Sequence, residues 1–325
     1  MRSFRLRFLF WAGCLAGLSL AVPGANVLLL NLDRDQPDTG PDPHSSTTAL
    51  QALLGDLGYG FDYLEVGLTD HSTLATIDYG RYELVFVCVG VNCLFQHAHR
   101  FTPAEGQPLV AYLQSGGNVY LEGGDVWVGD PQIHGAFNFC PAFQVTPIED
   151  GAVSDLYRIK GVKYSTPSTN NKNFLYTGDN CFMDKITNVT GYSSKIWENW
   201  TNADTPVIRN VAVAFAGTYK TVASAFEFGG IGDGTGNINQ SEVLRLYLDF
   251  FGVEPEVDYG NVDGLPGVTV HDLQVLAAYL AENLLALGVP LEQADLNADG
   301  VVDIRDLNIL DQFLAGNIDV LPHAG

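Results

Sequence analysis

Residues 295–306 read Asp-Leu-Asn-Ala-Asp-Gly-Val-Val-Asp-Ile-Arg-Asp, and this stretch decides the fold of the C-terminal part of the chain. Side chains that carry oxygen stand at positions 1, 3, 5, 9 and 12 of the stretch, and glycine stands at position 6. Calcium takes about six to eight oxygen ligands, and this spacing wraps a chain around one ion. The predicted ligands are Asp295, Asn297, Asp299, the carbonyl of Val301, Asp303 and Asp306.

A second, less regular copy of the loop lies upstream. Its predicted ligands are Asp258, Asn261, Asp263, Thr269 and Asp272. Aligned from Asp258, this copy has one extra residue after Asp258 and two more around Leu265-Pro266. The sequence therefore predicts one calcium ion at the second loop and leaves open whether a second ion binds at the first.

Each loop leads into a helix of matching pattern. Leu273, Leu276 and Leu280 in one helix correspond to Leu307, Leu310 and Leu314 in the other. Two loop–helix repeats without a leading helix resemble a type I dockerin, over residues 258–317. The resemblance implies a small all-α unit with two EF-hand-like repeats that binds a cohesin domain on a scaffold or cell surface. It also implies partner contacts at loop positions 10 and 11, which are Val270, His271, Ile304 and Arg305.

The N-terminus and the charge indicate an exported protein. Residues 1–7 are basic and residues 8–20 apolar, with small residues before a cleavage point after Ala21, so residues 1–21 read as a signal peptide. No other stretch is apolar enough to cross a membrane. The net charge is −22, and from Glu254 onward thirteen acidic residues accompany one arginine, which excludes nucleic acid as a partner. We expect a secreted, extracellular protein.

Residues 26–252 alternate between strand-like and helix-like segments. Apolar runs predict strands at 27–32, 61–66, 84–89 and 118–122, with helices between them, and regular order returns at 207–251 after an irregular excursion. This alternation predicts parallel strands with right-handed crossovers, and so a three-layer α/β sandwich with a mostly parallel sheet. Residues 253–257 form an acidic linker.

The large domain resembles the class I glutamine amidotransferase-like domains of flavodoxin type. Residues 112–127, 178–184 and 219–230 carry this likeness. Active members place a Cys within Gly-x-Cys-x-Gly on a strand-to-helix turn. Here the turn after the strand at 118–122 has neither Cys nor Ser, and Cys88-Val-Gly90 lacks the leading glycine. We therefore predict a domain without catalytic activity.

The cysteines left after signal removal are Cys88, Cys93, Cys140 and Cys181, an even number that favours disulfides in an oxidising compartment. Cys88 lies inside an apolar run, so a buried thiol is an alternative. A zinc site formed by Cys88, Cys93, His97 and His99 is a further alternative.

Three other groups of residues have both a functional and a structural interpretation. Glu122, Asp125, Asp130 and His134 follow a strand end, where they form either an acid–base pair or ordinary loop contacts. Residues 229–236 are glycine-rich, which suggests loop flexibility more than phosphate binding. Trp127, Tyr192, Trp197 and Trp200 could stack on a glycan, but packing in the core or at an interface is the favoured interpretation.

Three functions follow from these observations. The first is calcium-dependent docking of a displayed large domain. The second is an accessory hydrolase acting on polysaccharide or peptide in a cellulosome-like complex. The third is a calcium-stabilised extracellular protein without a cohesin partner.

Overall fold

Apolar runs near the N-terminus form the centre of a large sheet. In β1 (Val27–Asn31) and β3 (Leu84–Cys88) successive side chains alternate between the two faces of the sheet. Val27 and Leu29 pack into one core cluster, whereas Leu28 packs into the other. Because both faces are covered, these strands read as unbroken apolar runs.

The computed structural model divides into two compact units, residues 1–254 and 255–325. The residues that it describes are 26–33, 45–66, 71–91, 99–152, 156–200, 209–255, 257, 259–265, 267–287 and 289–321. The predicted signal peptide lies outside them. Within the described parts, no helix combines the length and the apolar character that crossing a membrane requires.

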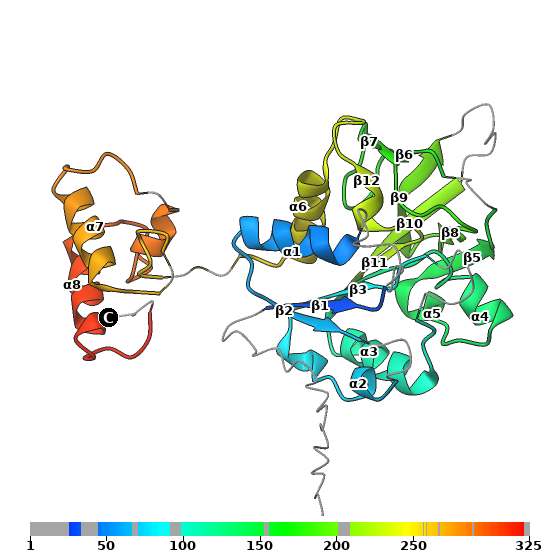
Figure 1. Cartoon of the computed structure of the whole chain (residues 1–325), viewed down its shortest axis with the longest axis horizontal. Coiled ribbons are helices and arrows are strands. Elements are labelled where there is room, and N and C mark those ends of the chain that lie inside the picture. Colours follow the sequence, from blue (N-terminus) through cyan, green and yellow to red (C-terminus); the bar gives the residue numbers. More distant parts are fainter. Residues whose placement is uncertain are drawn as a thin grey trace, which may run out of the picture. The chain divides into compact units, whose positions relative to one another are not determined.

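The N-terminal unit is built on a ten-stranded sheet. Its other strands are β2 (Phe61–Glu65), β4 (Asn118–Glu122), β6 (Arg158–Gly161), β7 (Asn173–Tyr176), β9 (Ser193–Trp200), β10 (Arg209–Ala216), β11 (Lys220–Ser224) and β12 (Ile231–Gly232). The order is β12-β7-β6-β9-β10-β11-β4-β3-β1-β2 (Figure 1). A separate antiparallel pair joins β5 (Val145–Glu149) and β8 (Lys185–Asn188).

Helices cover both faces of the sheet. Side chains from α1 (Ser46–Asp56) and α6 (Gln240–Phe251) join one core cluster, and those from α2 (His71–Ala75) and α3 (Pro103–Gln114) join the other (Figure 1). The shorter helical segments of this unit are η1 (Tyr79–Arg81), α4 (Gly129–Ile133), α5 (Cys140–Phe143) and η2 (Phe228–Gly230).

The start of α6 shows how sequence sets a helix boundary. The N–H of Asn239 donates to the Glu242 carboxylate at 2.9 Å, and the N–H of Glu242 donates to the Asn239 side chain at 2.8 Å. This reciprocal pair satisfies two backbone donors that the first helical turn leaves without partners. Gly252, with φ of 75°, ends the helix. The helix therefore begins at Gln240 and ends at Phe251.

The predicted fold class is wrong for the sheet. A flavodoxin-type sandwich has a mostly parallel sheet, but here only the ladders that join β2, β1, β3, β4 and β11 are parallel. The five ladders that continue the sheet from β11 to β12 are antiparallel. The segment 125–205, which the sequence presented as an irregular excursion, supplies β6, β7 and β9. Of these, β6 and β7 have only four residues each and are too short to show a clear alternation.

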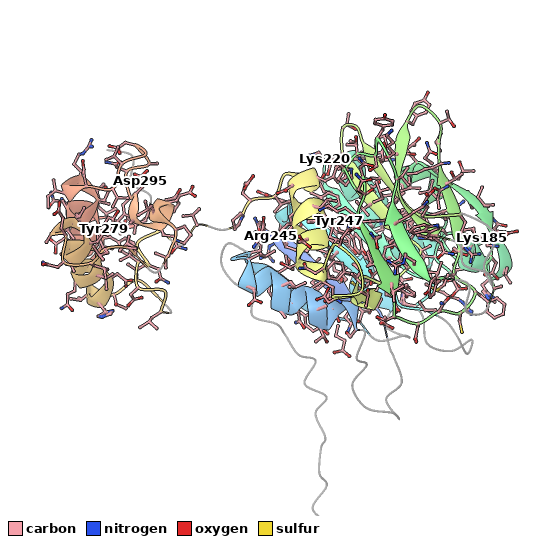
Figure 2. The ribbon with its side chains drawn as sticks, turned by 90° about the horizontal axis from the view of Figure 1, so that it is seen from above. Lys185, Lys220, Arg245, Tyr247, Tyr279 and Asp295 are labelled. Atoms are coloured by element: carbon pink, nitrogen blue, oxygen red, sulfur yellow. The ribbon has the colours of Figure 1, made fainter. Side chains whose placement is uncertain are left out.

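The antiparallel half of the sheet shares its core with the helices. Phe174 on β7 lies 5.4 Å from the ring of Trp197 and 5.9 Å from that of Phe226. The indole N–H of Trp197 donates at 2.8 Å to the hydroxyl of Tyr247 in α6. Figure 2 labels Tyr247. All of these side chains are buried and belong to the core cluster that also includes residues of α1 and α6. The parallel and antiparallel parts of the sheet therefore share one core on the face that these two helices cover.

The C-terminal unit consists of α7 (Val270–Leu280), η3 (Leu291–Ala294) and α8 (Ile304–Leu314), with loops before each long helix. Figure 2 marks Tyr279 in α7 and Asp295 at the start of the second loop. The leucine stripes predicted from the sequence form its core, in which Leu276 and Leu310 are fully buried.

We expect Phe174→Ala to lower the free energy of unfolding of the N-terminal unit by about 3–5 kcal/mol, because it removes a buried ring and leaves a cavity. Tyr164→Ala is the control, since that ring is 86% exposed and its loss should change the free energy by less than about 0.5 kcal/mol. Denaturant unfolding followed by tryptophan fluorescence measures both. Equal stability of the two variants would show that the antiparallel half is not part of the main core.

Candidate metal centre

One buried carboxylate organises the second loop. Asp306, at position 12, is fully buried and accepts three backbone N–H groups. Its Oδ1 accepts from Leu296 at 2.8 Å and Asn297 at 3.2 Å, and its Oδ2 accepts from Asp303 at 2.8 Å. These bonds join positions 2, 3 and 9 of the loop to the first turn of α8. The loop is therefore closed by a side chain from the first turn of the helix.

The first loop has the same arrangement of hydrogen bonds. Asp272 is also fully buried. Its Oδ1 accepts from Val262 at 2.8 Å and Asp263 at 3.1 Å, and its Oδ2 accepts from Thr269 at 2.7 Å. If Asp272 is position 12, its three donors again stand at positions 2, 3 and 9. The two repeats are thus equivalent in backbone connectivity.

This equivalence corrects the predicted boundary of the first loop. Position 1 is Asn261, so the loop runs from Asn261 to Asp272 and contains twelve residues without insertions. Alignment from Asp258, as in the sequence analysis, instead leaves three extra residues in the loop. Asp258 itself lies outside the described residues.

The corrected register shows how the two loops differ as calcium sites. The second loop offers carboxylates at positions 1, 5, 9 and 12, whereas the first has them only at positions 3 and 12. Leu265 occupies position 5 of the first loop and supplies no side-chain donor. Because the number of charged ligands tunes calcium affinity, the second loop is the stronger candidate.

Local turns hold the second loop in a curved path. Asp295 accepts N–H groups from Asp299 at 3.1 Å and Gly300 at 2.7 Å, and Asn297 accepts from Asp299 at 2.9 Å. Gly300 has a φ of 82°, in the left-handed region that glycine adopts without strain. An ionised carboxylate has about four lone-pair positions, so these bonds leave capacity for a cation.

The side chains are not already drawn together around a common point. Among the described residues, no group of three or more His, Cys, Asp or Glu side chains is arranged to hold a metal ion. The donor types and their order fit calcium, and binding would require small movements of the carboxylates toward one centre. The candidate site thus depends on the loop spacing and its hydrogen bonds.

The predicted partner-contact residues lie on the surface beside these loops. Val270 and Ile304, at position 10 of each loop, are 60% and 59% exposed. His271, at position 11, pairs with Asp263 at 2.5 Å. Arg305, at the second position 11, also pairs with its own loop. The equivalent residues are therefore both apolar at position 10, and both contact a loop carboxylate at position 11.

The N-terminal unit carries a buried carboxyl group at the carboxyl end of its parallel strands. Glu122, the last residue of β4, is fully buried. Its Oε2 accepts the hydroxyl of Tyr120 at 2.6 Å and the N–H of Phe228 at 2.7 Å, while its Oε1 has no hydrogen-bond partner among the residues that the structure describes. Burial raises the pKa of Glu122 above its ordinary value.

Cys88, the register partner of Glu122 on β3, is unsuited to nucleophilic chemistry. It is fully buried, and desolvation followed by the nearby Glu122 charge raises its pKa well above the ordinary value. An activated cysteine needs the opposite shift, toward the thiolate.

The other residues near this strand end are engaged separately. Asp130 pairs with Arg100 at 2.9 Å, and His134 is exposed. Asp184, which the sequence did not single out, accepts N–H groups from Trp127, Val128 and Gly129 and so fixes the turn after β4. Glu122 and Asp130 are therefore each hydrogen-bonded or ion-paired to residues outside this group of four.

The cysteines differ from the predicted disulfide set. Cys88 and Cys140 are buried free thiols, and Cys181 is disulfide-bonded. Cys140 donates its S–H to the carbonyl of Trp127 at 3.3 Å, which places it in the core. Cys93 and His97 of the alternative zinc site lie outside the described residues. His99 bonds Glu105 through Nε2 at 2.9 Å.

The glycine-rich segment 229–236 has a packing role. Ile231 and Gly232 form β12, and a side chain at Gly230 or Gly236 would collide with β7 or its neighbour Gly178. Close backbone approach therefore explains these glycines better than loop flexibility does.

The four aromatic residues divide between core and surface. Trp127 and Trp197 are fully buried, and their indole N–H groups donate to protein oxygens. Trp200 and Tyr192 are 46% and 69% exposed. Only the latter two are placed where a glycan could reach them.

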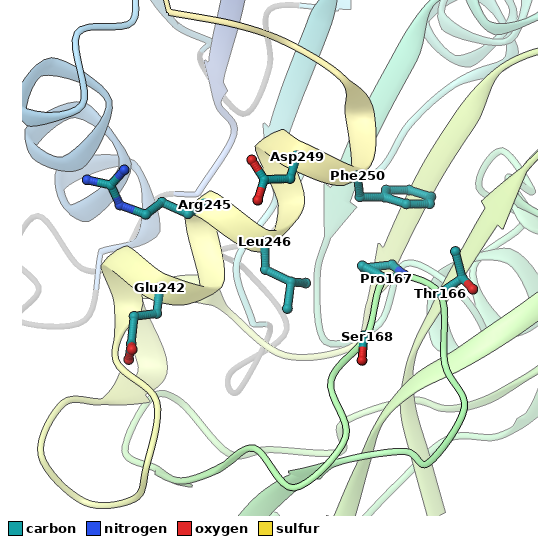
Figure 3. A pocket seen from close by; sticks show the side chains of 8 residues that line it. All are labelled: Thr166, Pro167, Ser168, Glu242, Arg245, Leu246, Asp249 and Phe250. Carbon is teal, nitrogen blue, oxygen red and sulfur yellow. The ribbon is translucent and has the colours of Figure 1, made fainter. Parts of the chain in front are cut away.

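A surface cavity of about 520 Å³ lies between α6 and the segment 166–168. Leu246 and Phe250 point toward that segment, whereas Arg245 points away from it (Figure 3). The sequence gave no signal for this cavity, because its walls come from parts of the chain about 75 residues apart.

No protein-family model and no curated protein matches this sequence. A solved β-galactosidase from Rahnella sp. R3 matches with 11% identity and a TM-score of 0.46, over 72% of this chain and 32% of that one. The carbohydrate deacetylase Agd3 matches with 14% identity and a TM-score of 0.46, over 79% and 40%. A cohesin ScaC–dockerin ScaB complex from Acetivibrio cellulolyticus matches with 23% identity and a TM-score of 0.20, over 21% and 94%.

The chain thus spans about a third of the length of the β-galactosidase chain that it resembles. Likenesses this distant do not establish a family or an activity.

We expect Asp306→Ala to destabilise the C-terminal unit by about 2–4 kcal/mol even in chelator, since three buried or partly buried N–H groups lose their acceptor. Asp311→Ala removes an exposed carboxylate from the same helix and serves as the control. Thermal unfolding of the C-terminal unit, followed by circular dichroism, compares them. If both variants melt with the wild type, the carboxylate does not hold the loop.

Glu122 should make the stability of the N-terminal unit depend on pH. Because its pKa is raised in the folded protein, its contribution is fully present below the unfolded pKa and is lost as pH rises through the folded value. Glu122→Gln does not titrate and keeps an acceptor for Tyr120 and Phe228. Its stability relative to wild type should therefore increase as pH rises from acid toward neutral.

Denaturant unfolding of the N-terminal unit at several pH values measures this difference. Glu65→Gln, at an exposed strand end, is the control. A constant difference between Glu122→Gln and wild type at every pH would contradict the assignment.

Proposed function

We propose that this is a secreted calcium-binding protein whose C-terminal unit docks onto a cohesin domain of a scaffold or cell-surface protein. The observation that carries the proposal is the matched closure of two twelve-residue loops by Asp272 and Asp306. Loops of this length, closed onto a following helix, place backbone and side-chain oxygens around a cation.

The second loop is the proposed calcium site, and the first binds calcium weakly or serves as a structural copy. Calcium would balance charge in a segment that carries thirteen acidic residues and one arginine. Ligand that binds only the folded form stabilises it, so calcium should strengthen the C-terminal unit specifically.

The docking surface would include Val270 and Ile304. These exposed apolar side chains stand at equivalent loop positions next to the carboxylates that close the loops, so ordering of the loops would fix their direction. A partner that buries Val270 and Ile304 would gain apolar contact area at the centre of the interface. The acidic residues of the C-terminal unit would lie around that centre.

In this proposal the N-terminal unit is the displayed cargo. Its fully buried Cys88, with a raised pKa, argues against nucleophilic catalysis at the end of β3. Its own large core supports folding without calcium.

Asp299→Ala in the full-length protein should weaken calcium binding at the second loop by roughly tenfold or more, because it removes one of four charged ligands. Asp319→Ala, which removes a carboxylate outside both loops, should leave affinity unchanged. Isothermal calorimetry measures both affinities. Calcium binding by Asp299→Ala at wild-type strength would sink the site assignment.

Docking is tested by immobilising purified cohesin domains and measuring capture of the full-length protein in calcium and in chelator. Capture should require calcium and should fall in the double variant Val270→Asp/Ile304→Asp. Calcium binding without capture by any cohesin would instead favour a calcium-stabilised protein without this partner.

A further inference from the structure

Arg305 forms an ion pair with two of the carboxylates assigned to calcium. Its guanidinium contacts Asp303 through Nε, at 3.1 and 3.0 Å from the two carboxylate oxygens, and through Nη2 at 2.7 Å. Its Nη1 lies 2.8 Å from Oδ2 of Asp299. One side chain therefore bridges loop positions 5 and 9, which are both proposed calcium ligands.

The backbone reinforces this arrangement. The N–H of Arg305 donates to Oδ1 of Asp303 at 2.7 Å, because Asp303 is the N-cap of α8. The helix start thus brings the Arg305 side chain close to the carboxylate that it contacts.

The first loop repeats the arrangement with different residues. His271, also at position 11, contacts Asp263 at position 3. Position 5 of that loop is Leu265 and position 9 is Thr269, and neither has a carboxylate. Asp263 is therefore the one carboxylate of this loop other than the buried Asp272. In both repeats, the side chain at position 11 turns back onto a carboxylate of its own loop.

A guanidinium and a calcium ion make incompatible demands on these oxygens. The guanidinium needs lone pairs directed outward to its planar N–H groups, whereas calcium needs the carboxylates turned toward one centre. The carboxylates of the second loop are not gathered around such a centre in the presence of this pair. Binding the ion through Asp299 and Asp303 would therefore break contacts of Arg305.

We propose that Arg305 is a built-in competitor of calcium in the second loop, and that the ion displaces its guanidinium and so frees it to contact an acidic partner surface. This inference rests on the proposed function, because it assumes that the loop binds calcium. Arg305 is the only arginine or lysine from residue 254 onward, so its release would supply a cation that the segment otherwise lacks.

The test uses the full-length protein with Arg305→Met and Arg305→Lys. Arg305→Met keeps a long side chain without charge, and it should bind calcium roughly three- to tenfold more tightly than wild type at low ionic strength. Arg305→Lys keeps the charge but lacks the planar guanidinium that bridges two carboxylates. Its calcium affinity should therefore lie between those of wild type and Arg305→Met. Arg81→Met, which removes an exposed arginine of the N-terminal unit, should match wild type.

Calorimetry gives the affinities, and the nitrogen-15 resonance of the Arg305 Nε–H reports the pair directly. On calcium addition this N–H should exchange faster with water, since it loses its carboxylate partner. Equal or weaker binding by Arg305→Met, wild-type affinity in Arg305→Lys, or an Nε–H that stays protected would each overturn the competition. Absence of calcium binding in wild type and all variants would overturn the proposed function instead.

Discussion

The closure of each C-terminal loop by the carboxylate at position 12 is the interaction on which that unit depends. A short acidic loop has few apolar side chains to bury, so its path must be set by polar contacts. Asp306 and Asp272 provide them by accepting N–H groups from both ends of their loops. With the loops closed, Leu296 and Val262 at position 2 are directed into the core beside Leu310 and Leu276.

The N-terminal unit is stabilised in a different way. Its centre is apolar on both faces of the sheet, and polar groups such as the indole of Trp197 and the carboxylate of Asp184 have hydrogen-bond partners there. Glu122 differs from these two, because one of its oxygens is buried without a hydrogen bond to any described residue. Ionisation of such a group lowers the stability of the fold. Its raised pKa therefore predicts a pH-dependent stability and is not by itself a sign of catalysis.

The sequence predicted the parts of the fold that repeat at a regular interval. The apolar runs of β1 and β3 and the leucine stripes of α7 and α8 each carry a local signal. The antiparallel half of the sheet does not, because β6 and β7 are short and their partners lie far along the chain. The sequence analysis also placed position 1 of the first loop at Asp258, whereas the hydrogen bonds of Asp272 place it at Asn261. These bonds join residues that are not adjacent in the chain, so the sequence alone does not show them.

The position-12 aspartates belong to two structures at once. Each accepts the N–H of the residue at position 9, and that residue, Asp303 or Thr269, is the N-cap of the following helix. The last residue of the loop is therefore also the third residue of the helix. A substitution of Asp272 or Asp306 that alters the loop therefore also alters the following helix, so few other residues are tolerated at these two positions. The intervening positions, where one repeat has Leu265 and the other Asp299, can diverge without loss of the fold, which explains how two loops of one shape come to differ so widely in charge.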